Sequence, residues 1–382
     1  MTERIFDFDG HVLDFEAKVL ASFKTDKGYG IILDRTAFAP EGGGQPSDIG
    51  LLGDAEVFDV QTEDGELVHY TTKSLLAGDT VWCSVDKRRR TRHLQNHSGE
   101  HIVAGLIYKK YGYNNVGFHL GHEDVTIDVD GIIDIKELRE IEREANEIVV
   151  KNLDVYAVYP DEKELQNMFY RSKLDLSENV RIVIIEGMDA CACCAPHVKK
   201  TGEIGIIKLI SCGRYKGGTR IHMKCGFDAL DEANGEYDRA LAISNMISLP
   251  RENIAEGVKK VLDDVSTLKS EIYALKKKII EMKIDSATKN GQGNIVFVEE
   301  DMNMQDLRAI VEGSLYKTKG ICAAFSGSDE DGYSFVLGYE GEDFAERTRD
   351  ILDKLSCNGG GKAPFIQGKA KCKIQNIRNL LD

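Results

Sequence analysis

The sequence has few of the features that mark secreted or membrane proteins. It contains no apolar run long enough to cross a bilayer, and its N-terminus has no signal-peptide pattern. Its nine cysteines are an odd number. Three of them crowd into four positions and the rest are scattered, which indicates metal binding and buried thiols rather than a disulfide framework. We therefore expect a cytoplasmic protein with reduced thiols and no membrane partner.

The sequence also has fewer basic than acidic residues. Lysine and arginine number 49 against 64 aspartates and glutamates, so the 382 residues carry a formal net charge of −15. Such a charge repels phosphate on average, and nucleic acid is expected to bind only where cations are concentrated. Two stretches qualify: residues 87–92 include Arg88, Arg89 and Arg90, and residues 362–378, which lack acidic side chains, include Lys362, Lys369 and Lys371. Either stretch alone would indicate a solvated surface, but together on an acidic chain they favour phosphate contacts.

The chain is longer than one core usually serves, and its first domain is predicted to be a small β-barrel or sandwich over residues 1–85. Strands are expected at residues 17–23, 29–33, 56–61 and 80–85, between glycine and aspartate turns. The loop between the second and third strands contains Gly42, Gly43 and Gly44. Their backbone can approach a ligand closely and direct N–H groups at an anion or a carbonyl oxygen. A flexible hairpin loop is an equal alternative from this stretch alone.

Residues 86–226 carry a candidate metal site. His93, His97 and His101 recur every four residues, which places them one turn apart on one face of a helix. Further along the chain, the segment Cys191-Ala192-Cys193-Cys194-Ala195-Pro196-His197 offers a thiolate and another imidazole. Sulfur together with imidazole nitrogen is a ligand set that suits zinc, and we expect His97 and His101 to be the first two ligands.

The same block is expected to be α+β. The patterns predict a helix over 97–111 with Asn96 as its cap, an amphipathic helix over 135–149, and strands over 155–158, 180–185, 204–210 and 220–225. The Cys/His element then lies in the turn after a strand, where a metal would tie distant segments together. His93 is an alternative ligand in register with the other histidines, and the thiols of Cys191 and Cys194 are competitors for the metal.

The last part of the chain is predicted to be a helical spacer, residues 227–292, followed by a small α/β domain, residues 293–382. The spacer has a helix over 228–247 and a second helix with Pro250 in its first turn. Apolar residues from Ile254 to Met282 alternate steps of four and three, which is typical of a coiled coil. That seam would contact either the preceding helix or a second copy in a homodimer. The final domain is expected to have strands at 295–298, 321–325 and 334–337, and helices at 304–316 and 344–356.

Three segments, Thr36–Gly50, Arg92–His101 and Cys193–Gly205, resemble the editing domain of alanyl-tRNA synthetase and its free-standing AlaX-type trans-editing relatives. The glycine-rich stretch Cys357–Gly368 is similar to the signature that closes the C-terminal domain of alanyl-tRNA synthetase. The same domain type accompanies the DHH phosphoesterases. The resemblance implies the long AlaX architecture, which joins an editing module, a helical spacer and a tRNA-binding tail, without a class II aminoacylation core.

The resemblance also implies a reaction and its residues. It makes His97, His101, Cys193 and His197 the ligands of one zinc ion per chain. It places Thr36 and Gln45 beside the substrate, and we expect the backbone amides of Gly43 and Gly44 to polarise the ester carbonyl. The implied activity is hydrolysis of the ester of tRNA(Ala) mischarged with serine, and in some members with glycine. We expect the Thr36 hydroxyl to read the serine hydroxyl, since a polar group that requires a partner rejects an analogue without one.

The sequence departs from the family at one element. Members usually have Cys-Gly-Gly-Thr-His where this chain has Cys193-Cys194-Ala195-Pro196-His197. A non-catalytic zinc-containing tRNA-binding protein is therefore an alternative. A DHH-related phosphodiesterase is a weaker one, because the chain has no Asp-His-His segment. Whether zinc is catalytic or structural stays open, because four protein ligands usually mark a closed site and a catalytic zinc keeps a position for water.

Overall fold

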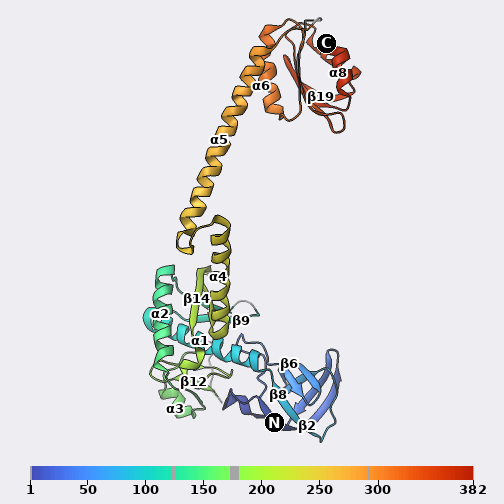
Figure 1. Cartoon of the computed structure of the whole chain (residues 1–382). Coiled ribbons are helices and arrows are strands. Elements are labelled where there is room, and N and C mark those ends of the chain that lie inside the picture. Colours follow the sequence, from blue (N-terminus) through green and yellow to red (C-terminus); the bar gives the residue numbers. More distant parts are fainter. Residues whose placement is uncertain (1, 123–124, 173–179, 291–292, 382) are drawn as a thin grey trace. The chain divides into compact units, whose positions relative to one another are not determined.

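The computed structural model describes residues 2–122, 125–172, 180–290 and 293–381. The chain divides into two compact units, Met1–Ile243 and Ser244–Asp382. Both units combine strands with helices, so the predicted α+β class is confirmed (Figure 1). Gln292, the predicted end of the helical spacer, lies outside the described residues. No helix within the described ranges is long and apolar enough to span a bilayer.

Six strands of the first unit close into a barrel, which corresponds to the small barrel expected over residues 1–85. In barrel order they are β2 (Asp14–Thr25), β3 (Gly28–Leu33), β7 (Glu66–Thr71), β6 (Ala55–Glu63), β5 (Gly50–Leu52) and β8 (Thr80–Val85), all antiparallel to their neighbours. Alternate residues of β2, among them Phe15, Ala17 and Val19, point into the barrel core. Strands β5 and β7 were not expected from the sequence. Outside the barrel, β1 (Glu3–Arg4) pairs in parallel with β4 (Arg35–Thr36).

Helix α1 (Lys87–Tyr111) leads from the last barrel strand into the rest of the first unit (Figure 1). The Asp86 side chain caps it by accepting a hydrogen bond of 2.7 Å from the Arg89 amide, and Gly112 ends it in the left-handed conformation with φ 72°. The predicted start at His97 with Asn96 as the cap is therefore wrong. Asn96 lies inside the helix, where its side chain accepts from the Cys225 amide at 2.9 Å.

Two antiparallel sheets surround α1. One has the order β14 (Ile207–Tyr215), β15 (Gly218–Cys225), β10 (Val125–Val129) and β9 (Asn115–Leu120), and the other has β11 (Val155–Val158), β12 (Ile182–Ile185) and β13 (Asp189–Ala192). Helix α2 (Ile135–Lys151) packs on α1 and β14 and begins with a capping box between Asp134 and Glu137, and α3 (Glu162–Asn167) is a single short helix. The strand predicted over 204–210 begins only at Ile207, after a 3-10 turn at Thr201–Ile204.

The helices of the spacer are α4 (Gly226–Ile247) and α5 (Ile254–Ser286). Pro250 does not lie in the first turn of α5 as predicted, because a 3-10 turn at Arg251–Asn253 separates them. The side chains of the predicted seam are exposed to solvent, for example Val261 at 49%, Leu268 at 56% and Leu275 at 58%. A coiled-coil partner for α5 stays a prediction.

The C-terminal part of the second unit has one mixed sheet. Its order is β16 (Ile295–Glu299), β17 (Cys322–Ser328), β18 (Gly332–Gly338), β20 (Phe365–Ala370) and β19 (Cys357–Lys362), with α6 (Met304–Ser314), α7 (Phe344–Lys354) and α8 (Ile374–Leu381). Only β16 and β17 are parallel. The three predicted strands and both predicted helices are present. The glycine-rich signature forms the β19–β20 hairpin, on which Lys362 and Lys369 are exposed.

Candidate metal centre

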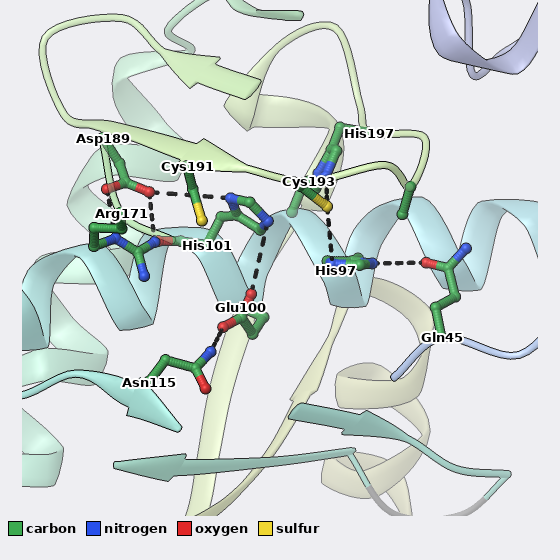
Figure 2. A network of polar contacts seen from close by, with 12 residues as sticks. Gln45, His97, Glu100, His101, Asn115, Arg171, Asp189, Cys191, Cys193 and His197 are labelled. Carbon is green, nitrogen blue, oxygen red and sulfur yellow. Dashed lines mark hydrogen bonds and ion pairs between the residues drawn. The ribbon is translucent and has the colours of Figure 1, made fainter. Parts of the chain in front are cut away.

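Four side chains from two elements converge in the first unit. His97 and His101 come from α1, and Cys193 and His197 come from the turn after β13 (Figure 2). One ligand atom from each side chain lies within 4.8 Å of all the others. The one-turn spacing brings the rings of His97 and His101 to a centroid separation of 5.4 Å. These are the four residues proposed as ligands from the sequence.

The distances between donor atoms fit zinc. The Cys193 Sγ lies 3.5 Å from Nε2 of His97 and 3.4 Å from Nε2 of His197. In a tetrahedral site with Zn–S of about 2.3 Å and Zn–N of about 2.0 Å, sulfur and nitrogen would be about 3.5 Å apart. The protein therefore already holds one sulfur and two nitrogens at the separation that a bound zinc requires.

Hydrogen bonds fix the outer nitrogen of two of the imidazoles. Nδ1 of His97 donates to Oε1 of Gln45 at 2.8 Å, and Nδ1 of His197 contacts Oγ of Ser98 at 3.1 Å. Ser98 Oγ also accepts from the Val198 amide at 3.2 Å. A proton on Nδ1 leaves the Nε2 lone pair directed at the cluster, which is the arrangement of a metal-binding histidine. Gln45, predicted beside the substrate, thus acts on a candidate ligand.

In the absence of a bound cation, burial disfavours the charged forms of the side chains in the cluster. Burial raises the pKa of the Cys193 thiol to about 12. Burial, followed by the neighbouring His101 and His97, lowers the pKa of His197 well below its usual value. The imidazole is therefore neutral, as a metal ligand must be, and a divalent cation among the four groups would stabilise the Cys193 thiolate. The donor set and its surroundings fit zinc.

A buried arginine holds the turn that carries Cys193 and His197. Nη1 of Arg181 donates to the carbonyl oxygens of Cys193 and Ala195, both at 2.8 Å, and Nη2 donates to the carbonyl of Asp7 at 2.9 Å. The Cys193 amide in turn donates to the Arg181 carbonyl at 3.0 Å. In this chain the Cys-Cys-Ala-Pro-His turn is therefore ordered by a side chain that the motif does not contain.

The competing ligands lie outside the four-residue cluster. His93 is buried elsewhere, with Nδ1 3.7 Å from the Asp48 carboxylate. Cys191 and Cys194 contribute to the wall of the adjoining cavity but not to the group of converging donor atoms. Among the described residues, the geometry favours the ligand set with His97, His101, Cys193 and His197.

A cavity of about 640 Å³ opens onto the cluster. Its wall includes Gly42 and Gly43 from the glycine-rich loop, the imidazoles of His97 and His101, and the aromatic side chains Tyr108, Phe118 and Phe169. Tyr108 and Phe169 lie with ring centroids 5.9 Å apart, and Phe169 is 72% exposed. The cavity thus combines a candidate metal centre with an accessible aromatic surface.

Comparison with known proteins supports a specific family. Residues 180–222 match the family model "Threonyl and Alanyl tRNA synthetase second additional domain", and residues 8–89 match "tRNA synthetases class II (A)". The chain is 27% identical to the alanyl-tRNA editing protein AlaX-L of Pyrococcus horikoshii over 99% of its own length and 96% of that protein. The family models and this nearly end-to-end alignment make the chain similar to alanyl-tRNA editing proteins.

Full-length ligases of the family are similar as well. The chain is 30% identical to the alanine–tRNA ligase of Methanopyrus kandleri and 31% identical to that of Halobacterium salinarum. The alignments cover 96% and 88% of this chain but only 42% and 38% of the ligases. The chain therefore spans about two-fifths of the length of these two relatives.

The structure places Thr36, predicted to read the substrate, in β4, where its side chain is buried against His69 of the barrel strand β7. Thr36 is fully buried, and its hydroxyl lies 2.8 Å from Nε2 of His69. Burial lowers the pKa of His69 to about 4, and the neutral ring donates from Nδ1 to the Ile31 carbonyl at 3.1 Å. His69 Nε2 is then an acceptor for the Thr36 hydroxyl. Thr36 does not line the described cavity, so its contact with substrate stays a prediction.

The two predicted catalytic glycines differ in their surroundings. Gly43 lines the cavity with φ 61° and has open space where a Cβ would be. Gly44 has φ 87°, and a Cβ there would meet the Phe118 carbonyl oxygen at 2.0 Å. Its own carbonyl accepts from the Leu120 amide at 2.8 Å. Gly44 therefore joins the loop to β9, whereas Gly43 keeps the position from which an amide could approach a substrate.

The predicted tRNA contacts separate into buried and exposed residues. Arg90 is 1% exposed, and its guanidinium binds the Asp48 carboxylate at 2.5 Å and the Gly10 carbonyl at 2.8 Å. The prediction that Arg90 contacts tRNA is therefore wrong, because a buried guanidinium cannot reach phosphate. Arg89 is partly buried and donates from Nε to the Ser47 carbonyl at 2.9 Å. Arg88, Lys362, Lys369 and Lys371 are exposed, as phosphate contacts require.

Several site residues were not found from the sequence. Ser98 and Arg181 support the ligands, and Arg171 lines the cavity with its guanidinium paired to Asp189 at 2.8 and 2.6 Å. Glu100 also lines the cavity. A signal existed for Glu100 and Ser98, which lie between the two histidines on α1. No local pattern marks Arg171 or Arg181, whose partners are distant in the sequence.

Proposed function

We propose that this chain is a trans-editing deacylase that hydrolyses the ester of tRNA(Ala) mischarged with serine, and also with glycine. One zinc ion per chain would be bound by His97, His101, Cys193 and His197. The observation that carries the proposal is the four-donor cluster at a cavity in a chain that aligns end to end with AlaX-L, a protein named for alanyl-tRNA editing.

The cavity suits the 3′ end of an aminoacyl-tRNA. Tyr108 follows His101 by seven residues on α1, which is about 10 Å along a helix, or two turns. An ester held at the cluster would therefore place its nucleoside near Tyr108 and Phe169, where the base can stack on an aromatic ring. The exposed lysines of the β19–β20 hairpin, Lys362 and Lys369, would contact phosphates elsewhere on the tRNA.

Zinc would supply Lewis-acid polarisation of the ester carbonyl or of the attacking water. The protein's own groups position the reactants. Gln45 holds His97 in the ligand tautomer, and Ser98 hydrogen-bonds Nδ1 of His197. Gly43 lies where its backbone amide can approach the carbonyl oxygen.

The proposal is tested with purified full-length protein and Ser-, Gly- and Ala-tRNA(Ala), with and without a zinc chelator. We expect release of serine and glycine to be fast, release of alanine to be slow, and all activity above background to be lost with chelator. The variant Thr36→Val is expected to reduce the preference for serine over alanine if Thr36 reads the hydroxyl. Unchanged preference would remove Thr36 from that role.

A second candidate is a zinc-containing tRNA-binding protein without activity. It is favoured by the four protein donors, which match a closed structural zinc site. Tight binding of Ser-tRNA(Ala) with no release of serine, at full zinc occupancy, would establish this alternative and contradict the deacylase proposal.

A further inference from the structure

Glu100 occupies a special position in the wall of the cavity. It precedes His101 on α1, is 4% exposed and lines the cavity. Its carboxylate accepts a hydrogen bond from the side-chain amide of Asn115 on β9, and its other oxygen lies 3.8 Å from Nε2 of His101 (Figure 2). Asn115 is itself held, because its side-chain oxygen accepts from the Gly117 amide at 3.0 Å. The carboxylate is thus fixed in direction beside the candidate metal centre.

Glu100 lies next to the candidate metal centre but is not one of its ligands. The four converging donor atoms do not include a Glu100 oxygen. The imidazole of His101 lies between two carboxylates, with Nδ1 4.0 Å from Asp189 and Nε2 3.8 Å from Glu100. Asp189 is engaged by the Arg171 guanidinium through two hydrogen bonds. Glu100 and Asp189 therefore stand on different sides of His101 and have different surroundings.

The proposed substrate carries a positively charged group that would lie near Glu100. In an aminoacyl ester the amino group is attached to the carbon next to the reacting carbonyl. An α-amino group has a pKa near about 7.7–8.0, so a large share of the substrate is an ammonium ion at neutral pH. When the carbonyl lies at the cluster, the ammonium nitrogen is two bonds from the carbonyl carbon. A fixed carboxylate at that distance makes a charge-assisted hydrogen bond, which is stronger than a neutral one.

We propose that Glu100, oriented by Asn115, binds the α-ammonium group of the acyl ester and thereby selects aminoacyl esters over other esters of the same tRNA. This inference rests on the proposed deacylase function. On the other side of His101 the Asp189 carboxylate is already paired with the Arg171 guanidinium, which leaves the orientation of an ammonium toward Glu100 favoured.

The test compares two esters of tRNA(Ala). One is Ser-tRNA(Ala), and the other is its deaminated form, a 2,3-dihydroxypropionyl ester in which a hydroxyl replaces the amino group. The ratio of kcat/KM for the two esters is measured with the wild-type full chain and with Glu100→Gln, which keeps the shape and an oxygen acceptor for Asn115. Glu147→Gln, an exposed glutamate on α2 at the protein surface, is the matched control. Zinc content is measured for each protein.

We expect Glu100→Gln to lower the ratio of aminoacyl to hydroxyacyl hydrolysis by roughly tenfold to a hundredfold, which corresponds to the loss of a hydrogen bond between charged groups. Glu147→Gln should keep the wild-type ratio. If Glu100 only orients His101 or a water molecule, both esters lose rate equally and the ratio is unchanged, which overturns the inference while the deacylase function stands. If the wild type hydrolyses neither ester, the proposed function fails, and this inference fails with it.

Discussion

Replacing Arg181 by methionine tests how the metal-binding turn is held. The side chain is buried and donates to three carbonyl oxygens, those of Asp7, Cys193 and Ala195. Its guanidinium also lies 3.9 Å from the Asp7 carboxylate, which is 5% exposed. Methionine fills much of the same space but leaves the carbonyls without a donor and Asp7 with less positive charge nearby.

The expected loss of stability follows from these contacts. Breaking a buried charged interaction by removing one partner costs about 3–5 kcal/mol, since the remaining polar groups stay buried. For a unit of this size each kcal/mol lowers the melting temperature by about 2–4 °C, so Arg181→Met should melt roughly 10 °C lower. Because the turn carries two ligands, zinc affinity should fall by about 10–100-fold, as for other groups that orient metal ligands.

The assay is differential scanning calorimetry of the full chain, together with competition for zinc by a chromophoric chelator. Arg143→Met is the matched control, because that arginine is 87% exposed on α2. Arg181→Lys keeps the charge with a single donor group and should lie between the wild type and methionine. An Arg181→Met protein with wild-type melting temperature and zinc affinity would refute the role assigned to Arg181.

Three other changes have expected outcomes. Gln45→Leu removes the acceptor on Nδ1 of His97, and zinc affinity measured by chelator competition should fall by about 10–100-fold; unchanged affinity would show that Gln45 does not orient the ligand. Folding lowers the pKa of His69 from 6.5 to about 4, so this histidine's contribution of roughly 3 kcal/mol is present above pH 6.5 and is lost as the pH falls toward 4. The difference in unfolding free energy between pH 7 and pH 4 should therefore be smaller in His69→Gln than in the wild type. An equal difference in both proteins would show that His69 does not contribute to the pH dependence. Reversing the charges of the exposed Lys369 and Lys371 should weaken tRNA binding and reduce its salt dependence, with a slope that becomes shallower by about one for each phosphate that the protein no longer neutralises; an unchanged slope would place the tRNA elsewhere.

Each half of the ligand set depends on short-range geometry, and the resemblance to the editing domain joined the two halves. The interval between His97 and His101 is one helical turn, and Cys193 and His197 belong to one turn after a strand. The supports of these ligands could not be predicted in the same way. Gln45 reaches His97 only once its loop is packed against α1. Arg181, which precedes β12, reaches the turn after β13 only once these two strands pair.

The predicted exposure of Arg90 was wrong, because its burial depends on packing between distant parts of the chain and not on residue type. Arg90 belongs to a run of cations that looks like a surface patch, yet it is buried where α1 leaves the barrel, because Asp48 lies opposite it. Burial alone would raise the pKa of Asp48, but the charge of Arg90 and the hydrogen bonds of His93 and Arg90 outweigh it and lower the pKa to about 2. The same early turns of α1 are polar, which hid the true start of the helix at Lys87.

Thr36 shows the limit of transferring a role along the sequence. The sequence left Thr36 in the loop between two predicted strands, whereas it lies in β4, and its hydroxyl partner His69 comes from β7, a strand that the sequence did not reveal. For α5 the limit is different. The seam from Ile254 to Met282 was recognised from its heptad spacing, but its side chains are exposed within this chain, so any partner must be another surface or a second copy.

The most direct test of the metal centre is zinc X-ray absorption spectroscopy on the purified full-length protein and on Cys193→Ser. For the wild type we predict one zinc per chain with one sulfur at about 2.3 Å and nitrogen ligands at about 2.0 Å, and for Cys193→Ser we predict loss of the sulfur signal. A protein without stoichiometric zinc, a site with two or more sulfur ligands, or a sulfur signal that survives in Cys193→Ser would contradict the centre formed by His97, His101, Cys193 and His197.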